Sequence, residues 1–251
     1  MTGLQTSIDA FDLNDLWKWG ELIWWIRILI CVGIFACIVI LAFIAKASIA
    51  QKGIKKEVND NVVIIQKQDI FATTGLKVIP FNEFYDTLVD DNVIAHSSLN
   101  GIFIDKYVDD IEDLRRCIAE SDSQSSSLKP HIKNGRNCYP LGKIIKYDNE
   151  YLLLSFTHFA NNEAHLSHND FEKCLFNMWK EIERVYANRP IAIPLLGSGI
   201  TRFDDTPHKT HNSLISCILC TLKTSNVHIK QPITLCLTED VFDELNIYEL
   251  K

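Results

Sequence analysis

The most chemically specific segment of the chain is a glycine-rich turn that follows a short apolar run. Residues 191–193 are expected to form a buried strand, and Leu196-Gly-Ser-Gly-Ile200 follows shortly after it. Glycines let the backbone approach a ligand closely, and successive backbone N–H groups in such a turn can surround an anion such as a diphosphate. No Lys-Ser/Thr pair follows, so the segment is neither a nucleoside-triphosphatase loop nor a GxGxxG dinucleotide motif. A Gly-Ser-Gly turn alone is equally consistent with a plain tight turn.

Three further segments have spacings that metal or redox chemistry uses. His165-Leu-Ser-His168 and His208-Lys-Thr-His211 each separate two histidines by three positions, a spacing that can hold a metal ion. No second set of ligands accompanies either pair, so we expect solvent-facing histidines. Cys217-Ile-Leu-Cys220 has the spacing of a redox motif but lies inside an expected helix, which favours buried thiols acting as small apolar side chains.

The composition narrows the class of protein. The 251 residues carry a net charge of −7, and 47% of them are hydrophobic. Nucleic-acid-binding proteins need excess lysine and arginine to hold phosphates, so this balance argues against a nucleic-acid partner. The eight cysteines are scattered through apolar segments rather than spaced as a disulfide framework, which indicates a reducing compartment.

One uncharged, mostly apolar run lies near the N-terminus, between Arg27 and Lys46. Extended back to Leu22, it covers about 24 residues, or roughly 36 Å as a helix, which is enough to cross a membrane. A cleaved signal peptide is one alternative, because the cleavage-like Ser48-Ile49-Ala50 follows. However, the leader is long and acidic, and the run exceeds a normal signal core. A buried soluble helix, the other alternative, rarely stays apolar on all sides over this length.

The charges around this run predict its orientation. More lysines follow it than precede it, and basic residues favour the cytoplasmic side of a membrane. We expect a single-pass protein of the inner membrane with its C-terminal part in the cytoplasm. The chain then divides into an N-terminal segment 1–21, a transmembrane helix 22–45, a juxtamembrane linker 46–60 and a domain 61–251. Within the first segment, residues 8–19 are a candidate interfacial helix.

Apolar periodicity predicts alternating strands and helices in the domain. Short apolar runs are typical of buried strands, which we expect at 62–65, 76–79, 143–146, 151–156, 191–193 and 233–237. Amphipathic spacing predicts helices at 109–120, 171–186, 206–223 and 241–250. Pro80 is expected to end the second strand, Asp204-Asp205-Thr206 to cap the third helix, and the serine-rich residues 121–127 to form a mobile loop. The pattern indicates an α/β fold: a mixed sheet with helices on both faces.

These elements and motifs resemble a macro domain, the fold that binds ADP-ribose. The order helix, strand, Leu196-Gly-Ser-Gly-Ile200, Phe203 and helix resembles its C-terminal half. Upstream, Val62-Val-Ile-Ile-Gln-Lys-Gln-Asp-Ile-Phe71 resembles its first strand and Gly-Asp-Ile/Leu motif, with Gln68 in place of the glycine. The resemblance covers roughly residues 61–250 and is strongest over the last third.

The resemblance assigns roles to individual residues. By it, Asp69 receives the adenine amino group, and Asn82, which ends Val78-Ile-Pro-Phe-Asn82, lies near the distal ribose. Ser97-Ser-Leu-Asn-Gly101 takes the place of the glycine-rich substrate loop. Residues 196–200 take the place of the diphosphate loop, and Phe203 that of the aromatic ring beside the distal ribose.

Three segments resemble one family of macro domains in particular. They are Pro80-Phe-Asn-Glu-Phe-Tyr-Asp-Thr87, Ser97-Ser-Leu-Asn-Gly101 and Tyr139-Pro-Leu-Gly142, and they are similar to the Thoeris anti-phage effectors of the ThsA family. The apolar run resembles the transmembrane-macro, type II form of that family, which commonly has two membrane helices where this sequence has one clear span. The resemblance implies a sensor: a TIR-domain partner makes an ADP-ribose-derived signal from NAD, histidine-ADP-ribose for this type. The macro domain binds the signal, and the protein assembles as a homo-oligomer that disrupts membrane lipid.

The turn and the resemblance together give a set of candidate ligand-binding residues. Glu83, Tyr85, Asp86 and the 97–101 segment are candidates for a further pocket beyond the distal ribose, where a carboxylate suits an amine or an imidazole. The full set is Asp69, Ile70, Asn82, Glu83, Asp86, Ser98, Leu99, Asn100, Gly101, Leu196, Gly197, Ser198, Gly199, Ile200, Thr201, Arg202 and Phe203.

A membrane-tethered ADP-ribosyl hydrolase is the alternative function. Hydrolytic macro domains use a flexible glycine-rich loop and a nearby acid to place a water. Here only Gly101 remains of the loop glycines, and Asp86 and Asp105 are the nearest acids, both outside the motif. We therefore expect binding without turnover, with no catalytic residue, no metal and no cofactor. A scaffold with a vestigial pocket, held at the membrane to bind protein, is the third hypothesis.

Overall fold

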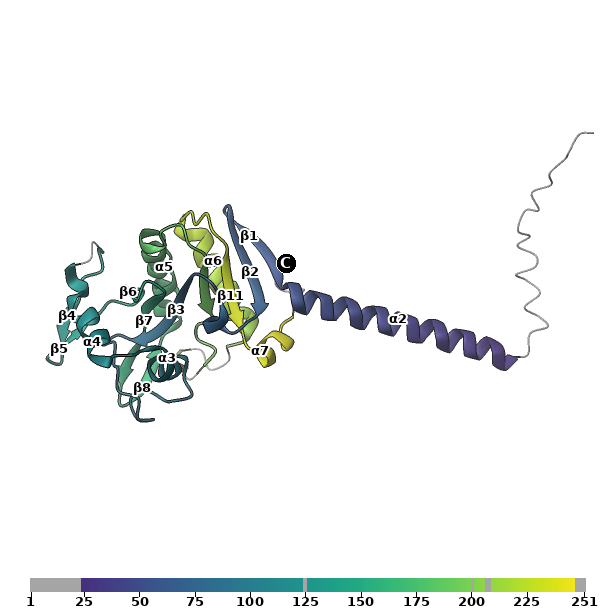
Figure 1. Ribbon diagram of the computed structural model, residues 1–251, viewed down its shortest axis with the longest axis horizontal. Helices are drawn as coiled ribbons and strands as arrows, with labels where there is room; N and C mark the ends of the chain where they lie inside the picture. The colour runs from purple at the N-terminus through teal and green to yellow at the C-terminus, as the bar shows by residue number, and fades with distance from the viewer. Residues whose placement is uncertain (1–23, 124–125, 200, 206–208, 247–251) are drawn as a thin grey trace, which may run out of the picture. The chain divides into compact units, whose positions relative to one another are not determined.

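The computed structural model describes residues 24–123, 126–199, 201–205 and 209–246. The chain forms two compact units, residues 1–50 and 51–251. Both units are drawn in Figure 1.

The first unit contains most of one long helix, α2 (Trp24–Lys52). Its stretch Ile26–Ile44 is, within the described part of the chain, the one helix long and apolar enough to cross a membrane, and none of that stretch is buried. Large apolar side chains along it, such as Phe35 and Phe43, are exposed. This helix corresponds to the span expected over 22–45, whereas the candidate interfacial segment 8–19 lies outside the described residues.

The linker expected over 46–60 is wrong. Helix α2 continues to Lys52, and β1 (Ile54–Val58) is an edge strand of the sheet, paired antiparallel with β2 (Asn61–Lys67). Asn59 and Asp60 both have positive φ, 46° and 63°, which is the backbone of a two-residue hairpin turn. The sequence carried a signal for this hairpin that was missed: β1 has apolar residues at both ends and charged residues between them, and an Asn-Asp turn follows.

The second unit is built on one mixed sheet. Its strand order is β1-β2-β11-β9-β3-β7-β8-β10, and β6 also pairs with β7. Strands β2, β11, β9, β3 and β7 run parallel, while β6 and β8 are antiparallel to β7. The remaining bounds are β3 (Leu76–Asn82), β6 (Ile144–Tyr147), β7 (Tyr151–Ala160), β8 (Glu163–Leu166), β9 (Ile191–Pro194), β10 (Arg202–Phe203) and β11 (Ile233–Leu237).

Helices cover both faces of this sheet (Figure 1), as expected. They are α3 (Leu99–Tyr107), α4 (Ile111–Ala119), α5 (His168–Val185), α6 (His211–Ser225) and α7 (Glu239–Asp243). Phe103 of α3 and Leu114 of α4 share a buried cluster with Leu153 of β7. Leu152 and Leu154 point to the opposite face of β7 and are also fully buried, and α5 and α6 pack together on that side.

Every expected strand is confirmed. The end of one strand, β3, and the start of one helix, α6, differ from expectation for reasons that the contacts show. Strand β3 continues through Pro80 to Asn82, because β3 pairs with β9 only over Leu76 and Lys77 and no N–H is required from Pro80 on that side. Helix α6 begins at His211, where Thr210 and Ser213 form a capping box. Asp204-Asp205-Thr206 is therefore not its cap.

Two smaller expectations also change. Helix α7 spans only Glu239–Asp243 of the region in which 241–250 was expected. The serine-rich segment is not an open loop where it is described: residues 120–123 form a 3-10 turn, and the hydroxyl of buried Ser126 donates to Glu181 at 2.9 Å.

A short hairpin outside the main sheet is attached to the end of β3 by charged side chains. This hairpin consists of β4 (His131–Lys133) and β5 (Arg136–Cys138). Lys133 Nζ lies 2.8 Å from Glu83 Oε1, and His158 Nδ1 lies 2.7 Å from Glu83 Oε2. The Glu83 side chain is only 3% exposed, so it is a buried carboxylate held by one ammonium and one imidazole.

This arrangement sets the charge of Glu83. Burial raises the pKa of the carboxyl, but the hydrogen bonds from His158 and Lys133 outweigh burial and lower the pKa from 4.5 to about 2. The same bond raises the pKa of His158. Because the folded-state pKa of Glu83 is below the unfolded value, its contribution to stability is present above about pH 4.5 and is lost as the pH falls toward about 2.

We predict that Glu83→Gln lowers the free energy of unfolding at neutral pH by on the order of 3 kcal/mol. The difference from wild type should shrink as the pH falls, because wild-type Glu83 is then protonated as well. Denaturant unfolding of the full chain across this range measures both quantities, with Glu57→Gln, an exposed carboxylate of β1, as the control. A pH-independent difference would contradict the assignment.

Candidate ligand-binding site

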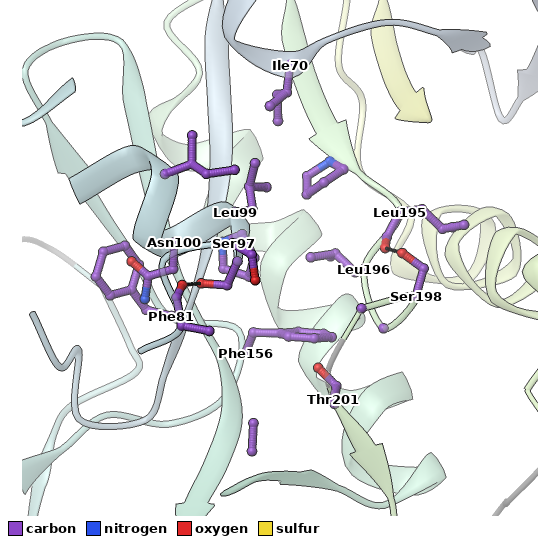
Figure 2. Close-up of a pocket in the computed structure, with 18 of the residues that line it drawn as sticks. Ile70, Phe81, Ser97, Leu99, Asn100, Phe156, Leu195, Leu196, Ser198 and Thr201 are labelled. Atoms are coloured by element: carbon purple, nitrogen blue, oxygen red, sulfur yellow. Dashed lines mark hydrogen bonds between the residues drawn. The ribbon is translucent and has the colours of Figure 1, made fainter. Parts of the chain in front are cut away.

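A cavity of about 630 Å³ opens where the parallel strands end. Its walls come from the residues just after β2, from the last residues of β3, from the turn after β9 and from the end of β11. The carboxyl ends of parallel strands are the usual place for ligands in α/β folds, and the volume is that of a small-molecule site. Figure 2 shows side chains from these segments converging on the space.

The glycine turn forms one wall of the cavity. Ser198 N donates to Leu195 O at 3.2 Å, and Ser198 Oγ donates to the same carbonyl at 2.7 Å (Figure 2). Gly197 has φ +84°, and a Cβ there would lie 3.2 Å from the Phe203 ring, so this position requires glycine. Gly199 has open space where a Cβ would be, so its lack of a side chain leaves room in the cavity.

Sequence reasoning missed the cation that holds this turn. Lys209 Nζ donates to Gly197 O, and to Thr201 O at 2.9 Å. The ammonium also lies 4.7 Å from the centroid of the Phe203 ring. Lys209 itself does not line the cavity, so it fixes the turn from behind the wall. The acceptors are backbone carbonyls, and no side-chain motif marks them in the sequence.

Asp69, Ile70 and Phe71 form another wall, directly after β2. Asp69 caps a 3-10 turn, where its Oδ1 accepts a bond from Phe71 N at 3.0 Å. Ile70 is buried against Ala192 and Cys236. The Phe71 ring stacks on Tyr107 with 4.2 Å between centroids and 10° between planes, so an exposed carboxylate lies beside a flat aromatic surface.

The 97–101 segment is the start of α3 rather than a loop. Ser98 caps this helix, because its Oγ accepts from Gly101 N at 3.0 Å and donates to Ala95 O at 2.7 Å. A Cβ on Gly101 would collide with Ala95 O, so this glycine serves packing and does not line the cavity. Ser98, Leu99 and Asn100 do line it.

Asn100 carries a buried polar atom, Oδ1, that lacks a hydrogen-bond partner among the described residues. Buried polar atoms are almost always paired, and an unpaired one costs free energy. Asn100 also lies in the cavity wall (Figure 2), so this unpaired atom belongs to a residue at the edge of the ligand space.

Asn82 lines the cavity and is held in place by the residues that follow β3. Its Nδ2 donates to Asp86 Oδ2 at 2.9 Å, and Asp86 forms an ion pair with Arg136 of the hairpin. Asn82 Oδ1 accepts from Phe84 N at 3.0 Å. The Asn82 amide therefore has a fixed orientation, set from outside the cavity.

Three of the candidates for a further pocket, Glu83, Tyr85 and Asp86, lie elsewhere in the domain. None of the three lines the cavity. Glu83 is engaged by Lys133 and His158, and the Tyr85 hydroxyl donates to Lys143 O at 2.8 Å in the core. Consecutive residues after a strand leave it in different directions, so adjacency to Asn82 did not bring these side chains to the ligand side.

The remaining candidates divide in the same way. Leu196, Gly197, Ser198, Gly199 and Thr201 line the cavity, as do Asp69, Ile70 and Asn82. Arg202 does not, since it pairs with Glu163 at 2.9 Å, and Phe203 packs edge-on against Phe171 at 5.4 Å between centroids. Ile200 lies outside the described residues.

The histidine and cysteine pairs form other contacts. His165 Nδ1 lies 2.8 Å from Asp204, and His168 Nε2 lies 3.4 Å from Glu172, so both engage carboxylates, while His208 is outside the described residues. No group of residues that could hold a metal occurs in the described part of the chain. Burial raises the pKa of the Cys217 thiol to about 12, whereas Cys220 is exposed, contrary to expectation.

Comparison with known proteins identifies the family. Residues 63–238 match the family described as "Thoeris protein ThsA, Macro domain". The chain is 34% identical over 264 residues to the Thoeris protein ThsA of Bacillus amyloliquefaciens (strain Y2), a match that covers 100% of this chain and 84% of that one.

Solved structures of the Oceanobacillus iheyensis macrodomain are also similar to it. A mutant with ADPR has a TM-score of 0.49 and 14% identity, covering 79% of this chain and 99% of its own. A second mutant has a TM-score of 0.47 and 14% identity, covering 76% and 88%. The family match and the whole-chain identity together show that the chain belongs to the Thoeris ThsA family and that residues 63–238 form its macro domain.

Proposed function

We propose that this protein is a membrane-anchored effector of anti-phage defence that is switched on by an ADP-ribose-derived signal. The observation that carries the proposal is the cavity at the carboxyl ends of the parallel strands, bounded by a glycine turn on one side and by Asp69 and a stacked aromatic pair on another. These walls suit a diphosphate and a purine ring, respectively.

The ligand proposed is histidine-ADP-ribose, made from NAD by a TIR-domain partner that acts through its product. Asp69 would accept the adenine amino group, the 196–201 turn would hold the diphosphate, and Asn82 and Asn100 would contact ribose hydroxyls. Glu83 and Asp86 are occupied by protein cations, so the group beyond the distal ribose would meet a wall that includes Phe159 and Ala164.

Charge placement supports binding without turnover over hydrolysis. Among the described residues that line the cavity, Asp69 is the one carboxylate, and it lies on the proposed adenine wall. Asp86 is paired with Arg136 and Asn82, and Asp105 lies 2.7 Å from the His96 ring. A hydrolase needs an acid near the distal ribose to place a water, and neither of these lines the cavity.

The output proposed is assembly at the inner membrane. Helix α2 supplies one segment long and apolar enough to span it, and the lysines after that segment would keep the macro domain in the cytoplasm. Ligand would favour a homo-oligomer that disrupts the bilayer. It can shift that equilibrium only by binding the assembled state more tightly than the free one.

Calorimetric titration of the full chain in detergent tests the ligand. We predict tight binding of histidine-ADP-ribose, weaker binding of ADP-ribose and NAD, and recovery of every ligand uncleaved. Gly199→Val should abolish binding, because its side chain would enter the open part of the cavity, and Gly199→Ala should weaken it less. Cleaved product would favour a hydrolase, and no binding by any of the three would leave a scaffold.

Dye release from vesicles tests the output. We predict that the reconstituted chain releases trapped dye only when the binding ligand is added, and that the particle mass in detergent rises under the same conditions. Gly199→Val should do neither, although it retains α2 and inserts normally. Constant mass together with dye release would reject assembly as the switch.

A further inference from the structure

Lys209 presents a cation to the glycine turn, and none of the described residues forms an ion pair with it. Its ammonium contacts the turn through Gly197 O and Thr201 O, and its other close neighbour is the Phe203 ring. No carboxylate lies within ion-pair distance of it in the described part of the chain. Carbonyl oxygens and an aromatic face carry partial charges only, so the contacts described for this ammonium do not balance its full positive charge.

The position of the Lys209 ammonium is unfavourable for a charged group. Lys209 is partly buried, and desolvation lowers the pKa of its ammonium. The surrounding carbonyls belong to residues that line the cavity, whereas Lys209 does not. The cation is therefore separated from the ligand space by the thickness of one turn of backbone, across which a low local dielectric transmits charge well.

The two carbonyl bonds also fix the shape of the turn. Gly197 and Thr201 bracket Ser198 and Gly199, and one ammonium joins the two ends. The first half of the turn is closed by the bond from Ser198 N to Leu195 O. Together these bonds fix the carbonyl groups of Leu195, Gly197 and Thr201, so the described part of the turn has a set shape where it lines the cavity.

We infer that Lys209 is the counter-cation and positioning residue of an anion site formed by residues 196–199 and Thr201, and that the anion is the diphosphate of a nucleotide ligand. This inference rests on the proposed function and adds the source of its charge recognition. The ammonium stays behind the wall and neutralises the bound diphosphate, and the backbone makes the direct contacts.

Substitution of Lys209 distinguishes a role in diphosphate binding from a role in folding alone. Lys209→Met should weaken ADP-ribose binding by about tenfold or more and leave adenosine binding unchanged, because adenosine has no diphosphate. Lys209→Arg should retain most of the affinity. Lys106→Met is the matched control, since Lys106 lines the cavity but is exposed and is not bonded to the turn, and it should lose less. Equal ADP-ribose affinity in Lys209→Met, or an equal loss for adenosine, would overturn the inference.

Proton uptake gives a readout that does not depend on the variants folding alike. A bound diphosphate stabilises the charged ammonium and raises its pKa, so at a pH between the free and bound values the wild-type chain takes up a proton on binding. Titration in buffers of different ionisation enthalpy measures this uptake. Lys209→Arg should show none, because arginine stays charged throughout. Absence of uptake in wild type as the pH rises toward the lysine range would count against Lys209.

The same experiment separates the two proposals. If wild type binds neither histidine-ADP-ribose nor ADP-ribose, the proposed function fails, and inorganic pyrophosphate then decides the inference. Pyrophosphate binding that Lys209→Met loses would sustain the anion site with another ligand. No pyrophosphate binding by wild type would end both.

Discussion

The site depends on the parallel pairing at the centre of the sheet. Strand β11 lies between β2 and β9 in parallel register, so three chain segments end side by side and release their backbones at one edge. Each exit continues into a cavity wall: the Asp69 turn after β2, the glycine turn after β9 and Thr238 after β11. Buried runs of β-branched and apolar residues drive that pairing, and the polar groups needed for ligand contact need only follow them.

Charges outside the cavity then fix what lies inside it. Arg136 holds Asp86, and Asp86 holds the Asn82 amide, so the β4–β5 hairpin sets the orientation of a cavity residue that it does not touch. Lys133 and His158 hold Glu83 one residue further on. On the opposite wall Lys209 does the same for the glycine turn through backbone carbonyls. The exposed cavity face is thus mostly apolar or neutral, and the ionic contacts that shape it lie one layer behind.

Sequence patterns predicted the parts of the molecule whose cause is local. The runs at 62–65 and 233–237 are apolar on both sides, as central strands must be, and the 171–186 spacing gives one buried stripe, so all three elements were identified. Helix α3 was missed because Ile102-Phe103-Ile104 are consecutive and give no helical period. The hairpin β4–β5 was missed because five of its six residues are exposed and its strands show no alternation.

The site residues also separate into those placed by local sequence and those placed by distant contacts. The glycine turn and Asp69 follow strands directly, so sequence order was enough to place them on the cavity wall. Glu83 and Asp86 depend on partners about 50 residues away, Lys133 and Arg136, and no local pattern announces such a pairing. The role of Lys209 is harder still to predict, because the groups that accept its hydrogen bonds are main-chain carbonyls and no residue type marks them. Long-range ion pairs therefore decided which carboxylates could face a ligand.

The far end of the glycine turn is tied to the surface of the domain. Strand β10 pairs with β8 directly after Thr201, Asp204 lies 2.8 Å from the His165 ring, and both oxygens of Asp205 accept from His168 N, at 2.9 and 3.0 Å. Asp205 thereby reaches the first residue of α5, and these carboxylates are exposed. The described residues 201–205 therefore connect the far end of the glycine turn to the start of α5 through hydrogen bonds and strand pairing. Coupling between two sites requires a connected element that both can bias, and these bonds supply such a connection between the cavity wall and α5.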